Sequence, residues 1–485
     1  MKKKIYILFS ILVSIISASI VNVGLQNDTF SAIKIGDYII KHGIDFKEHF
    51  NYDSTLTYHN ARWLFNVIVS FIYNNLGFIG IFIFVVLLSI LLGLLLFNVL
   101  YKRNKSLLLS FIITALTMSY LTGFISARAQ TISYILFFLE MVFIEKLIEK
   151  NKIKYSIYLI IISILIANIH TTVWPITIVL FIPYFMEYLI SSYIKGKILY
   201  CDVKNIKLLF ITFILVALSG FITPLGLLPY TYMFKTMSGI STRFIMELKP
   251  VNIFFDFNIL LLFIIYIYLF IYRKKKIKIS DIFMVTGLFI LAIMAIRNEA
   301  FFILLCTLSL SRTTMNQIDN DKLYKIEDKL LKEKFIIIII IICAFLISGF
   351  NYLVGIHNKE FINRKDYPVD AVNYIKENID TKNMRIYNGF SIGSYLEFND
   401  IKVFVDSRSE VYCKEFNNTS ILQDYYDLYY FKNYYKGILN KYNFTHLLIE
   451  NDTPLYQYIY YDKDYKIIYS DVYFTIFEHI KDESK

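Results

Sequence analysis

The 485-residue sequence is poor in charged residues and in cysteine. Charged residues make up 18% of the chain, against about 25% in ordinary soluble domains. A deficit of this size over so many residues excludes a disordered, collagenous or disulfide-rich secreted protein. The four cysteines lie far apart and form no Cys-x-x-Cys pair, so they indicate neither a disulfide framework nor a structural zinc site.

Hydrophobic residues, in contrast, make up 56% of the chain. They gather in long uncharged runs such as 77–100 and 335–350. Runs of this kind are long enough, or nearly so, to cross the ~30 Å hydrocarbon core of a bilayer. The net charge of +11 comes from basic residues between the runs, where membrane topology explains it better than nucleic-acid binding. The composition therefore predicts a polytopic membrane protein.

The distribution of basic residues predicts the topology. Lys2–Lys4 precede an apolar run at 5–23, which we interpret as an uncleaved first span rather than a cleaved signal peptide. The run 282–310 fits two short helices with a turn at 297–299, because one helix would place Arg297 and Glu299 near mid-membrane. Basic residues then concentrate on one side of the membrane. We expect about eleven spans (ten to twelve), with the N-terminus cytoplasmic and the C-terminal part outside the cytoplasm.

Charged residues become frequent from about residue 359 onward, and no later run is long enough to span. This change predicts a mainly α-helical transmembrane domain at 1–355 and a small extracytoplasmic α/β domain at 356–485. The elements expected in the small domain are a helix at 368–378, strands at 384–387, 403–405 and 446–449, and a hairpin of 466–469 with 473–477.

Polar residues gather in the connections expected on the outer side. In the first of these, Lys34, Asp37 and Lys41 recur at helical spacing, which predicts a helix in the outer interface; a second such helix is expected at 64–73. Later outer connections carry Arg128, Gln130, Asn168, His170, Lys235, Arg243, Glu247, Arg297 and Glu299. We expect these connections to converge on an outer-face cavity suited to a lipid-linked substrate with a polar head group.

Several segments carry a resemblance to a known family. They are Asn27-Asp28-Thr29-Phe30, the stretch 35–43, His59 through Leu64, Arg128-Ala129-Gln130 and Asn168-Ile169-His170. On these segments the chain resembles the GT-C class of integral-membrane glycosyltransferases, and in particular an uncharacterised bacterial subgroup. The resemblance implies a GT-C-like helical bundle that transfers a sugar from a polyprenyl-phosphate donor to an extracytoplasmic acceptor with inversion. The sequence departs from the pattern at Ile44-Asp45 and at Arg62, where relatives carry Pro and Glu.

The resemblance also implies roles for individual residues. Asp28 would be the catalytic base, and Arg128 and Arg297 would hold the departing phosphate. The remaining substrate-binding residues would be His59, Arg62, His170 and Glu299. Taken alone, Asp28 also fits a helix N-cap, each arginine fits a residue snorkelling to the interface, and His170 fits a hydrogen-bonded interfacial histidine. The alternative function is that of a non-catalytic membrane protein: a transporter, a lipid-binding scaffold or a pseudo-glycosyltransferase.

The C-terminal domain carries a second motif. The stretch 387–396 leads toward Asp406-Ser407-Arg408 and is similar to a segment of oligosaccharyltransferase catalytic subunits that helps to hold the acceptor. This similarity implies an acceptor-side role for Tyr395, Asp406 and Arg408, whereas the residues alone fit a structural ion pair equally well.

Cofactors and partners are less closely defined. Asp45, Glu48, His49 and Asp53 carry atoms that suit Mg²⁺ or Mn²⁺, but their spacing matches no metal motif, which favours a solvated loop. We therefore assign no metal ligands, and a requirement for a divalent cation stays open. The expected partners are the lipid bilayer, a polyprenyl-phosphate sugar and an acceptor glycan, lipid or protein, but no nucleic acid.

Overall fold

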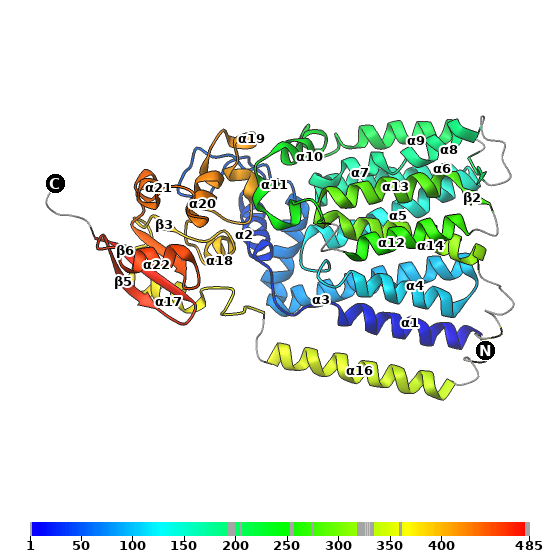
Figure 1. Cartoon of the computed structure of the whole chain (residues 1–485), viewed down its shortest axis with the longest axis horizontal. Helices are drawn as coiled ribbons and strands as arrows, with labels where there is room; N and C mark the ends of the chain where they lie inside the picture. The colour runs from blue at the N-terminus through cyan, green and yellow to red at the C-terminus, as the bar shows by residue number, and fades with distance from the viewer. Residues whose placement is uncertain are drawn as a thin grey trace. The chain divides into compact units, whose positions relative to one another are not determined.

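The computed structural model describes residues 2–191, 199–203, 206–252, 257–272, 276–317, 325, 327, 329, 334–357 and 361–480. It is mainly helical, with a four-stranded sheet near the C-terminus (Figure 1). The chain divides into two compact units. The helical unit comprises Met1–Val23, Ile79–Met233 and Met246–His357, and the mixed unit comprises Gly24–Phe78, Phe234–Ile245 and Asn358–Lys485. The mixed unit thus includes the first long connection, which the division at residue 355 places in the membrane domain.

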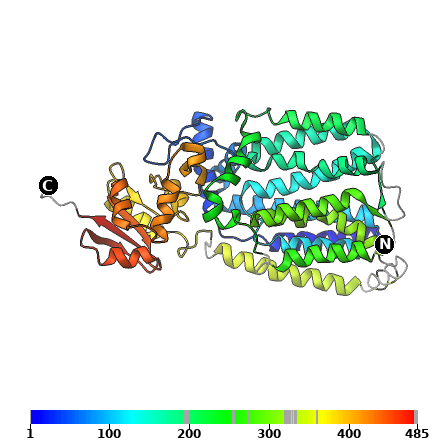
Figure 2. The same ribbon diagram turned by 45° about the horizontal axis from the view of Figure 1, so that its top comes forward.

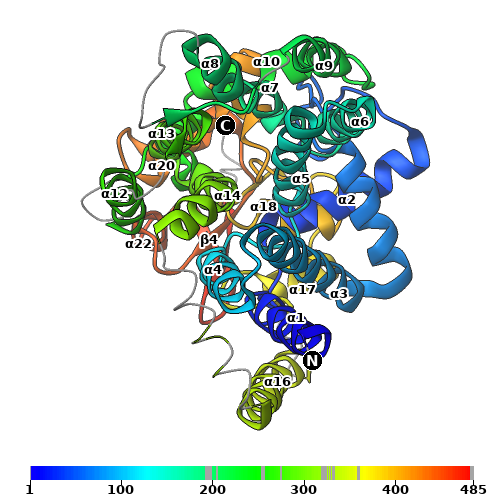
Figure 3. The ribbon, with the colours of Figure 1, turned by 90° about the vertical axis from the view of Figure 1, so that its right-hand side faces the viewer.

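The helical unit consists of helices that run side by side (Figure 2) and are seen nearly end on in Figure 3. Its elements are α1 (Lys2–Ser19), most of α3 (Trp63–Asn104), α4 (Leu107–Tyr120), α5 (Ala129–Lys150), α6 (Ile153–Ile169), η1 (Thr171–Val173), α7 (Pro175–Val179), α8 (Ile182–Ser191), α9 (Ile206–Ser219), part of α10 (Leu228–Ser238), η2 (Met246–Leu248), α12 (Phe257–Ile271), α13 (Ile279–Met294), η3 (Ile296–Asn298), α14 (Glu299–Gln317) and α16 (Lys334–His357). Two short strands, β1 (Leu199–Tyr200) and β2 (Ile277–Lys278), pair in parallel.

Two local predictions for these helices are confirmed. The run 282–310 forms α13 and α14, and η3 separates them at the predicted turn. In α3 the backbone of Gly77 has φ +63° and ψ −159°, so the helix is interrupted where the predicted segments 64–73 and 77–100 meet. Glycine occupies this backbone region without the steric cost that a Cβ atom brings.

Among the described residues, two helical stretches are long and apolar enough to cross a membrane. They are Trp63–Asn104 and Thr171–Ser191, the second made of η1, α7 and α8. Six other apolar helices have 10–17 residues, among them Lys4–Ser19 and Ile153–Ile169. Length and composition therefore support membrane association, and the count of eleven spans stays a prediction.

The mixed unit combines helices with the four-stranded sheet. Its helices are α2 (Asn27–His42), the first turns of α3, α11 (Ser241–Phe244), α17 (Val369–Asn378), α18 (Gly393–Phe398), η4 (Ser409–Tyr412), α19 (Lys414–Asn417), α20 (Ile421–Tyr429), α21 (Tyr435–Tyr442) and α22 (Pro454–Tyr460). The sheet has the order β3-β4-β6-β5, built from β3 (Ile386–Tyr387), β4 (His446–Glu450), β5 (Tyr465–Ser470) and β6 (Phe474–His479). β3 and β4 are parallel, and the other neighbours are antiparallel.

Most elements predicted for the C-terminal part are confirmed. The helix begins at Val369, directly after Pro368, and the predicted hairpin is β5 and β6. The predicted strand at 403–405 is wrong, because it forms only an isolated bridge between Val403 and Asn51. The side chain of Asn388 explains the difference: it accepts from the Phe404 N–H at 2.9 Å and donates to the Val405 carbonyl at 2.7 Å. A side-chain amide thus replaces the partner strand.

Candidate functional site

Asp28 lies inside the first turn of α2 and pairs with Arg62. The N-cap position belongs to Gln26, so the alternative that Asp28 is the N-cap is wrong. A carboxylate in the first turn still interacts favourably with the helix dipole. Nη1 of Arg62 donates to Oδ2 of Asp28 at 3.2 Å, and the two side chains are 18% and 12% exposed. The carboxylate is therefore held in place while part of it remains accessible to solvent.

The first turn of α2 contacts both halves of the C-terminal motif. Nδ2 of Asn27 donates to the Phe390 carbonyl at 3.0 Å, and the Oγ atoms of Ser31 and Ser407 lie 3.4 Å apart. The Phe30 ring lies edge-on to that of Tyr395, with centroids 5.2 Å apart. Two segments far apart in the sequence, around Asp28 and around Tyr395 to Arg408, thus belong to one compact unit.

A glycine allows part of this close packing. Gly393 begins α18, which packs against α2. A Cβ atom at Gly393 would lie 2.0 Å from the Val405 carbonyl oxygen and 2.8 Å from Cα of Asp406. The backbone of the Asp406 segment can therefore approach α18 only because residue 393 has no side chain.

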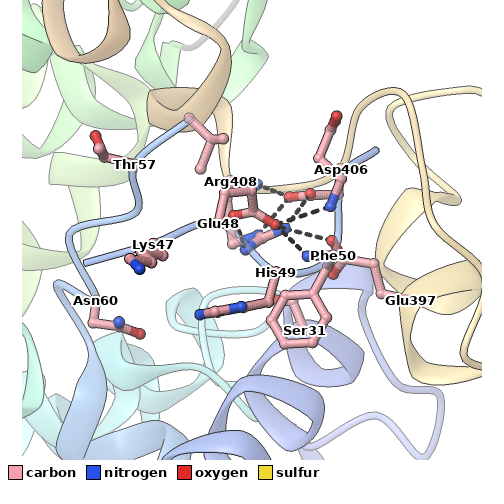
Figure 4. Close-up of polar contacts among 12 residues, drawn as sticks. Ser31, Lys47, Glu48, His49, Phe50, Thr57, Asn60, Glu397, Asp406 and Arg408 are labelled. Carbon is pink, nitrogen blue, oxygen red and sulfur yellow. Dashed lines mark hydrogen bonds and ion pairs between the residues drawn. The ribbon is translucent and has the colours of Figure 1, made fainter. Parts of the chain in front are cut away.

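Arg408 is fully buried at the centre of an ion cluster (Figure 4). Its Nη1 and Nη2 donate to Glu48 at 2.7 and 3.1 Å. Nε and Nη2 donate to Asp406 at 2.9 and 2.6 Å, and Nη2 also contacts Glu397. The Tyr412 hydroxyl donates to Asp406. The geometry is that of a structural ion cluster, and it leaves Arg408 no surface for an acceptor.

The charges of this cluster are unevenly distributed. Burial raises the pKa of Glu397 well above its ordinary value. The positive charge of Arg408 lowers this pKa, but the negative charge of Asp406 raises it further, so the net shift is upward. Burial opposes ionisation of Asp406 too, but the adjacent guanidinium outweighs burial and lowers the pKa of Asp406. The pKa of Arg408 is raised because its carboxylate neighbours overcome the effect of burial. Burial therefore favours the protonated form of Glu397, whereas the neighbouring charges favour the ionised forms of Asp406 and Arg408.

His59 lies near the segment 234–245. Its ring is edge-on to that of Phe416 at 5.6 Å, and Nζ of Lys235 lies 5.5 Å from the same Phe416 ring. Burial lowers the pKa of His59, and the charge of Lys235 lowers it further. A neutral imidazole can donate one hydrogen bond and accept another.

The other predicted site residues lie in the helical unit. Arg128 donates to both carboxylate oxygens of Glu247 at 2.6 and 3.0 Å. Nδ1 of His170 lies 2.9 Å from Oγ of Ser133, and Glu299 accepts from the Tyr120 hydroxyl at 3.4 Å. Arg297 is half-buried in η3. Convergence of these residues with Asp28, His59 and Arg62, which lie in the mixed unit, stays a prediction.

The four residues considered for a metal have other contacts. Nε2 of His49 lies 2.8 Å from Oδ2 of Asp45, Glu48 binds Arg408, and Asp53 accepts from Thr55. Within the described ranges, no group of three or more His, Cys, Asp or Glu side chains is arranged to hold a metal ion. Among the residues that the structure describes, none is therefore named as a ligand of a divalent cation.

Sequence reasoning missed the contribution of Glu48, which it placed in a solvated loop. Glu48 is buried, and its Oε1 also accepts from the backbone N–H groups of Phe50 and Asn51 at 2.7 and 3.1 Å. No local signal separates this glutamate from the other acidic residues of the loop, because its partner lies 360 positions away.

Comparison of the chain with models of known protein families gives no match, and comparison with curated proteins gives none either.

Proposed function

We propose that this protein is a membrane glycosyltransferase of the GT-C type. In this proposal it transfers a sugar from a polyprenyl-phosphate donor to an extracytoplasmic acceptor, with Asp28 as the catalytic base. The observation that carries the proposal is the position of Asp28. Its carboxylate is held by Arg62, remains partly exposed, and belongs to a helix turn packed against the C-terminal motif.

The proposed reaction is a single displacement with inversion. An acceptor hydroxyl or amide attacks the anomeric carbon of the donor while Asp28 takes the proton from the attacking atom. The bond between the anomeric carbon and the phosphate oxygen breaks, and polyprenyl phosphate leaves. Arg128 and Arg297 would stabilise the leaving phosphate, since a guanidinium group can bind two phosphate oxygens. For Arg128 this requires exchange of Glu247 for the phosphate.

The remaining site residues have positioning roles in this proposal. His59 and His170 would hydrogen-bond sugar or acceptor hydroxyls, and Glu299 would accept from the donor sugar. Arg62 would fix the orientation of the Asp28 carboxylate. Tyr395, which is 5% exposed, and the buried Arg408 would act on the acceptor side only by holding the neighbouring backbone in place.

The proposed location is a bacterial-type cell membrane crossed about eleven times. The two membrane-length helical stretches and the shorter apolar helices support it, together with the concentration of basic residues in alternate connections. Cysteine-accessibility mapping of position 299 and of the C-terminal part tests the topology. A C-terminal part labelled only from the cytoplasmic side would contradict it.

The activity is tested with full-length protein in phospholipid nanodiscs. Radiolabelled polyprenyl-phosphate sugars are supplied together with a membrane extract as the source of acceptor, and donor binding and donor consumption are measured separately. The proposal predicts consumption of at least one donor and label in a new product. Donor binding without consumption, for every sugar tested, would contradict it and favour the non-catalytic alternative.

A further inference from the structure

An ion pair in the helical unit places an exposed carboxylate on a more deeply placed arginine. Nη1 and Nη2 of Arg128 donate to Oε1 and Oε2 of Glu247 at 2.6 and 3.0 Å. The side chain of Arg128 is 22% exposed, and that of Glu247 is 46% exposed. The carboxylate is therefore the outer partner of the pair, and the guanidinium becomes open to a ligand where the carboxylate turns away.

A second arginine lies beside this pair. Arg297, in η3, is near enough to Glu247 and Arg128 to interact electrostatically with both. The segments that carry Glu247 and Arg297 are joined through the backbone, since the Ile296 N–H donates to the Lys249 carbonyl at 3.1 Å. Among the three charged side chains, two guanidinium groups thus face one carboxylate, and positive charge exceeds negative charge by one.

The backbone around Glu247 is anchored, so only its side chain has to move. The next residue, Leu248, is buried, and the Val251 N–H donates to the Ile293 carbonyl at 3.0 Å. Rotamer changes of exposed side chains are fast, and an ion pair in contact with solvent contributes little to stability. The Glu247 carboxylate can therefore leave Arg128 at a small cost in free energy.

The carboxylate of Glu145, in the same unit, shows the contrasting arrangement. It is 5% exposed and pairs with both Arg103 and Arg312. Removal of a carboxylate enclosed in this way would leave buried cations without a partner, which is costly. Glu145 is thus a structural counter-ion, whereas the exposed Glu247 is an exchangeable one.

Geometry and charge together select the ligand class. A guanidinium group binds two phosphate oxygens in the same forked geometry in which Arg128 binds the two oxygens of Glu247. A phosphate monoester carries a charge of about −1.5 to −2 at neutral pH, so it matches two guanidinium groups better than a carboxylate or a phosphodiester does. We propose that Glu247 is an internal occupant of a phosphate site, and that a phosphate monoester binds Arg128 and Arg297 by displacing it.

The inference deepens the proposed function, and rests on it, only where the monoester is called the leaving group of sugar transfer. The donor in that reaction is a phosphodiester, and cleavage of its sugar–oxygen bond gives the phosphate a second negative charge. Displacement of Glu247 would then favour the leaving phosphate over the bound donor, and a preference of this kind lowers the barrier to transfer. Binding of a phosphate monoester by itself requires no catalysis.

The test measures phosphate binding by isothermal titration calorimetry on full-length protein in phospholipid nanodiscs. The probes are geranyl phosphate, its methyl ester as a phosphodiester, and inorganic phosphate, and empty nanodiscs correct for partitioning into lipid. We expect the wild type to bind geranyl phosphate more tightly than the diester. Glu247→Gln should bind geranyl phosphate about five- to tenfold more tightly than the wild type, because no internal carboxylate competes for the site. Arg128→Gln should weaken binding about tenfold or more.

A double variant separates displacement from a general effect of charge. If Glu247 competes for Arg128, then Glu247→Gln should improve binding by less than about twofold once Arg128→Gln is present. The matched control is Glu149→Gln, which removes an exposed acid at the opposite end of α5 from Arg128 and should leave binding unchanged.

Three results would each overturn the inference: no binding of geranyl phosphate or inorganic phosphate, equal binding by the wild type and Glu247→Gln, or the full gain persisting in the double variant. Tighter binding of geranyl phosphate than of inorganic phosphate would identify a lipid-linked ligand, and equal affinities would identify a free phosphate; both support displacement. Tighter binding by Glu247→Gln without consumption of any sugar donor would contradict the proposed function alone. Donor consumption with unchanged binding by Glu247→Gln would contradict the inference alone.

Discussion

Arg408 and Glu48, which lie 360 positions apart in the sequence, form a bidentate ion pair with N–O distances of 2.7 and 3.1 Å. Both side chains are fully buried. The Arg408 guanidinium also lies 5.3 and 4.9 Å from the ring centres of Phe50 and Tyr58. The first long connection and the C-terminal part of the chain are thus joined through a desolvated charge cluster. This cluster fixes the backbone near Ser407, which contacts the helix that carries Asp28.

Replacement of Arg408 should strongly destabilise the mixed unit. In Arg408→Met, Glu48 and Asp406 would remain buried without their cation, and breaking such a pair costs about 3–5 kcal/mol. The measurement is thermal denaturation of the full chain, in which unfolding is detected as loss of protease resistance in the C-terminal part. Arg364→Met is the matched control, because Arg364 pairs with Asp370 at the surface with 67% and 45% exposure. Its effect should stay within about 1 kcal/mol, and equal losses in both variants would contradict the account.

The raised pKa of Glu397 makes the stability of the mixed unit depend on pH. Because burial raises its pKa above the ordinary value of 4.5, the folded state keeps a proton that the unfolded state loses as pH rises. The stabilisation is fully present below the pKa that Glu397 has in the unfolded chain. As pH rises from there to the pKa in the folded protein, stability falls by up to about 1.4 kcal/mol per pH unit. The pKa of Asp406 is lowered, so its contribution to stability has the opposite pH dependence. That contribution is lost as pH falls below 3.8, the ordinary pKa of an aspartate.

Glu397→Gln should therefore gain stability relative to the wild type as pH is raised from 5 to 8. Glutamine is neutral in both states, so it removes the cost of holding the proton while keeping a similar shape. Melting temperatures of both proteins across this range give the difference. Glu377→Gln, at an exposed position on α17, is the matched control for the substitution itself. A constant difference for Glu397→Gln would show that Glu397 is ionised in the folded protein.

Gly393→Ala should destabilise the mixed unit by about 1–3 kcal/mol, the usual cost of overpacking. The new Cβ atom would meet the Val405 carbonyl at 2.0 Å, so either α18 or the Asp406 segment must move. Gly437→Ala is the control: it lies in α21 with no atom within 4 Å of the added Cβ, and should gain roughly 0.5–1 kcal/mol from helix propensity. Denaturation midpoints of the two variants should move in opposite directions, and a neutral Gly393→Ala would refute the close approach.

Much of the local structure follows from sequence patterns. Apolar runs bounded by polar residues predict the helices, and Arg297 with Glu299 predicts the break between α13 and α14. Pro368 predicts the start of α17. These predictions succeed because each rests on interactions between residues a few positions apart.

Tertiary contacts explain the predictions that failed or were missed. The segment at 403–405 has the composition of a strand, but the Phe404 N–H and the Val405 carbonyl bond to the side chain of Asn388 instead of a partner strand. Glu48 is buried against Arg408, which lies 360 positions away in the sequence. Pairings across hundreds of residues leave no periodic signal in the chain, so a single sequence does not reveal them.

The central claim is tested most directly by comparing two aspartate variants of α2 in the transfer assay. Asp37 pairs with Lys41 on the same helix at 2.7 Å, so Asp37→Asn reproduces the loss of a paired carboxylate away from the proposed site. Asp28→Asn should lower kcat about 100-fold or more with donor binding retained, whereas Asp37→Asn should stay within about twofold of wild type. Equal transfer by Asp28→Asn and wild type would contradict the account.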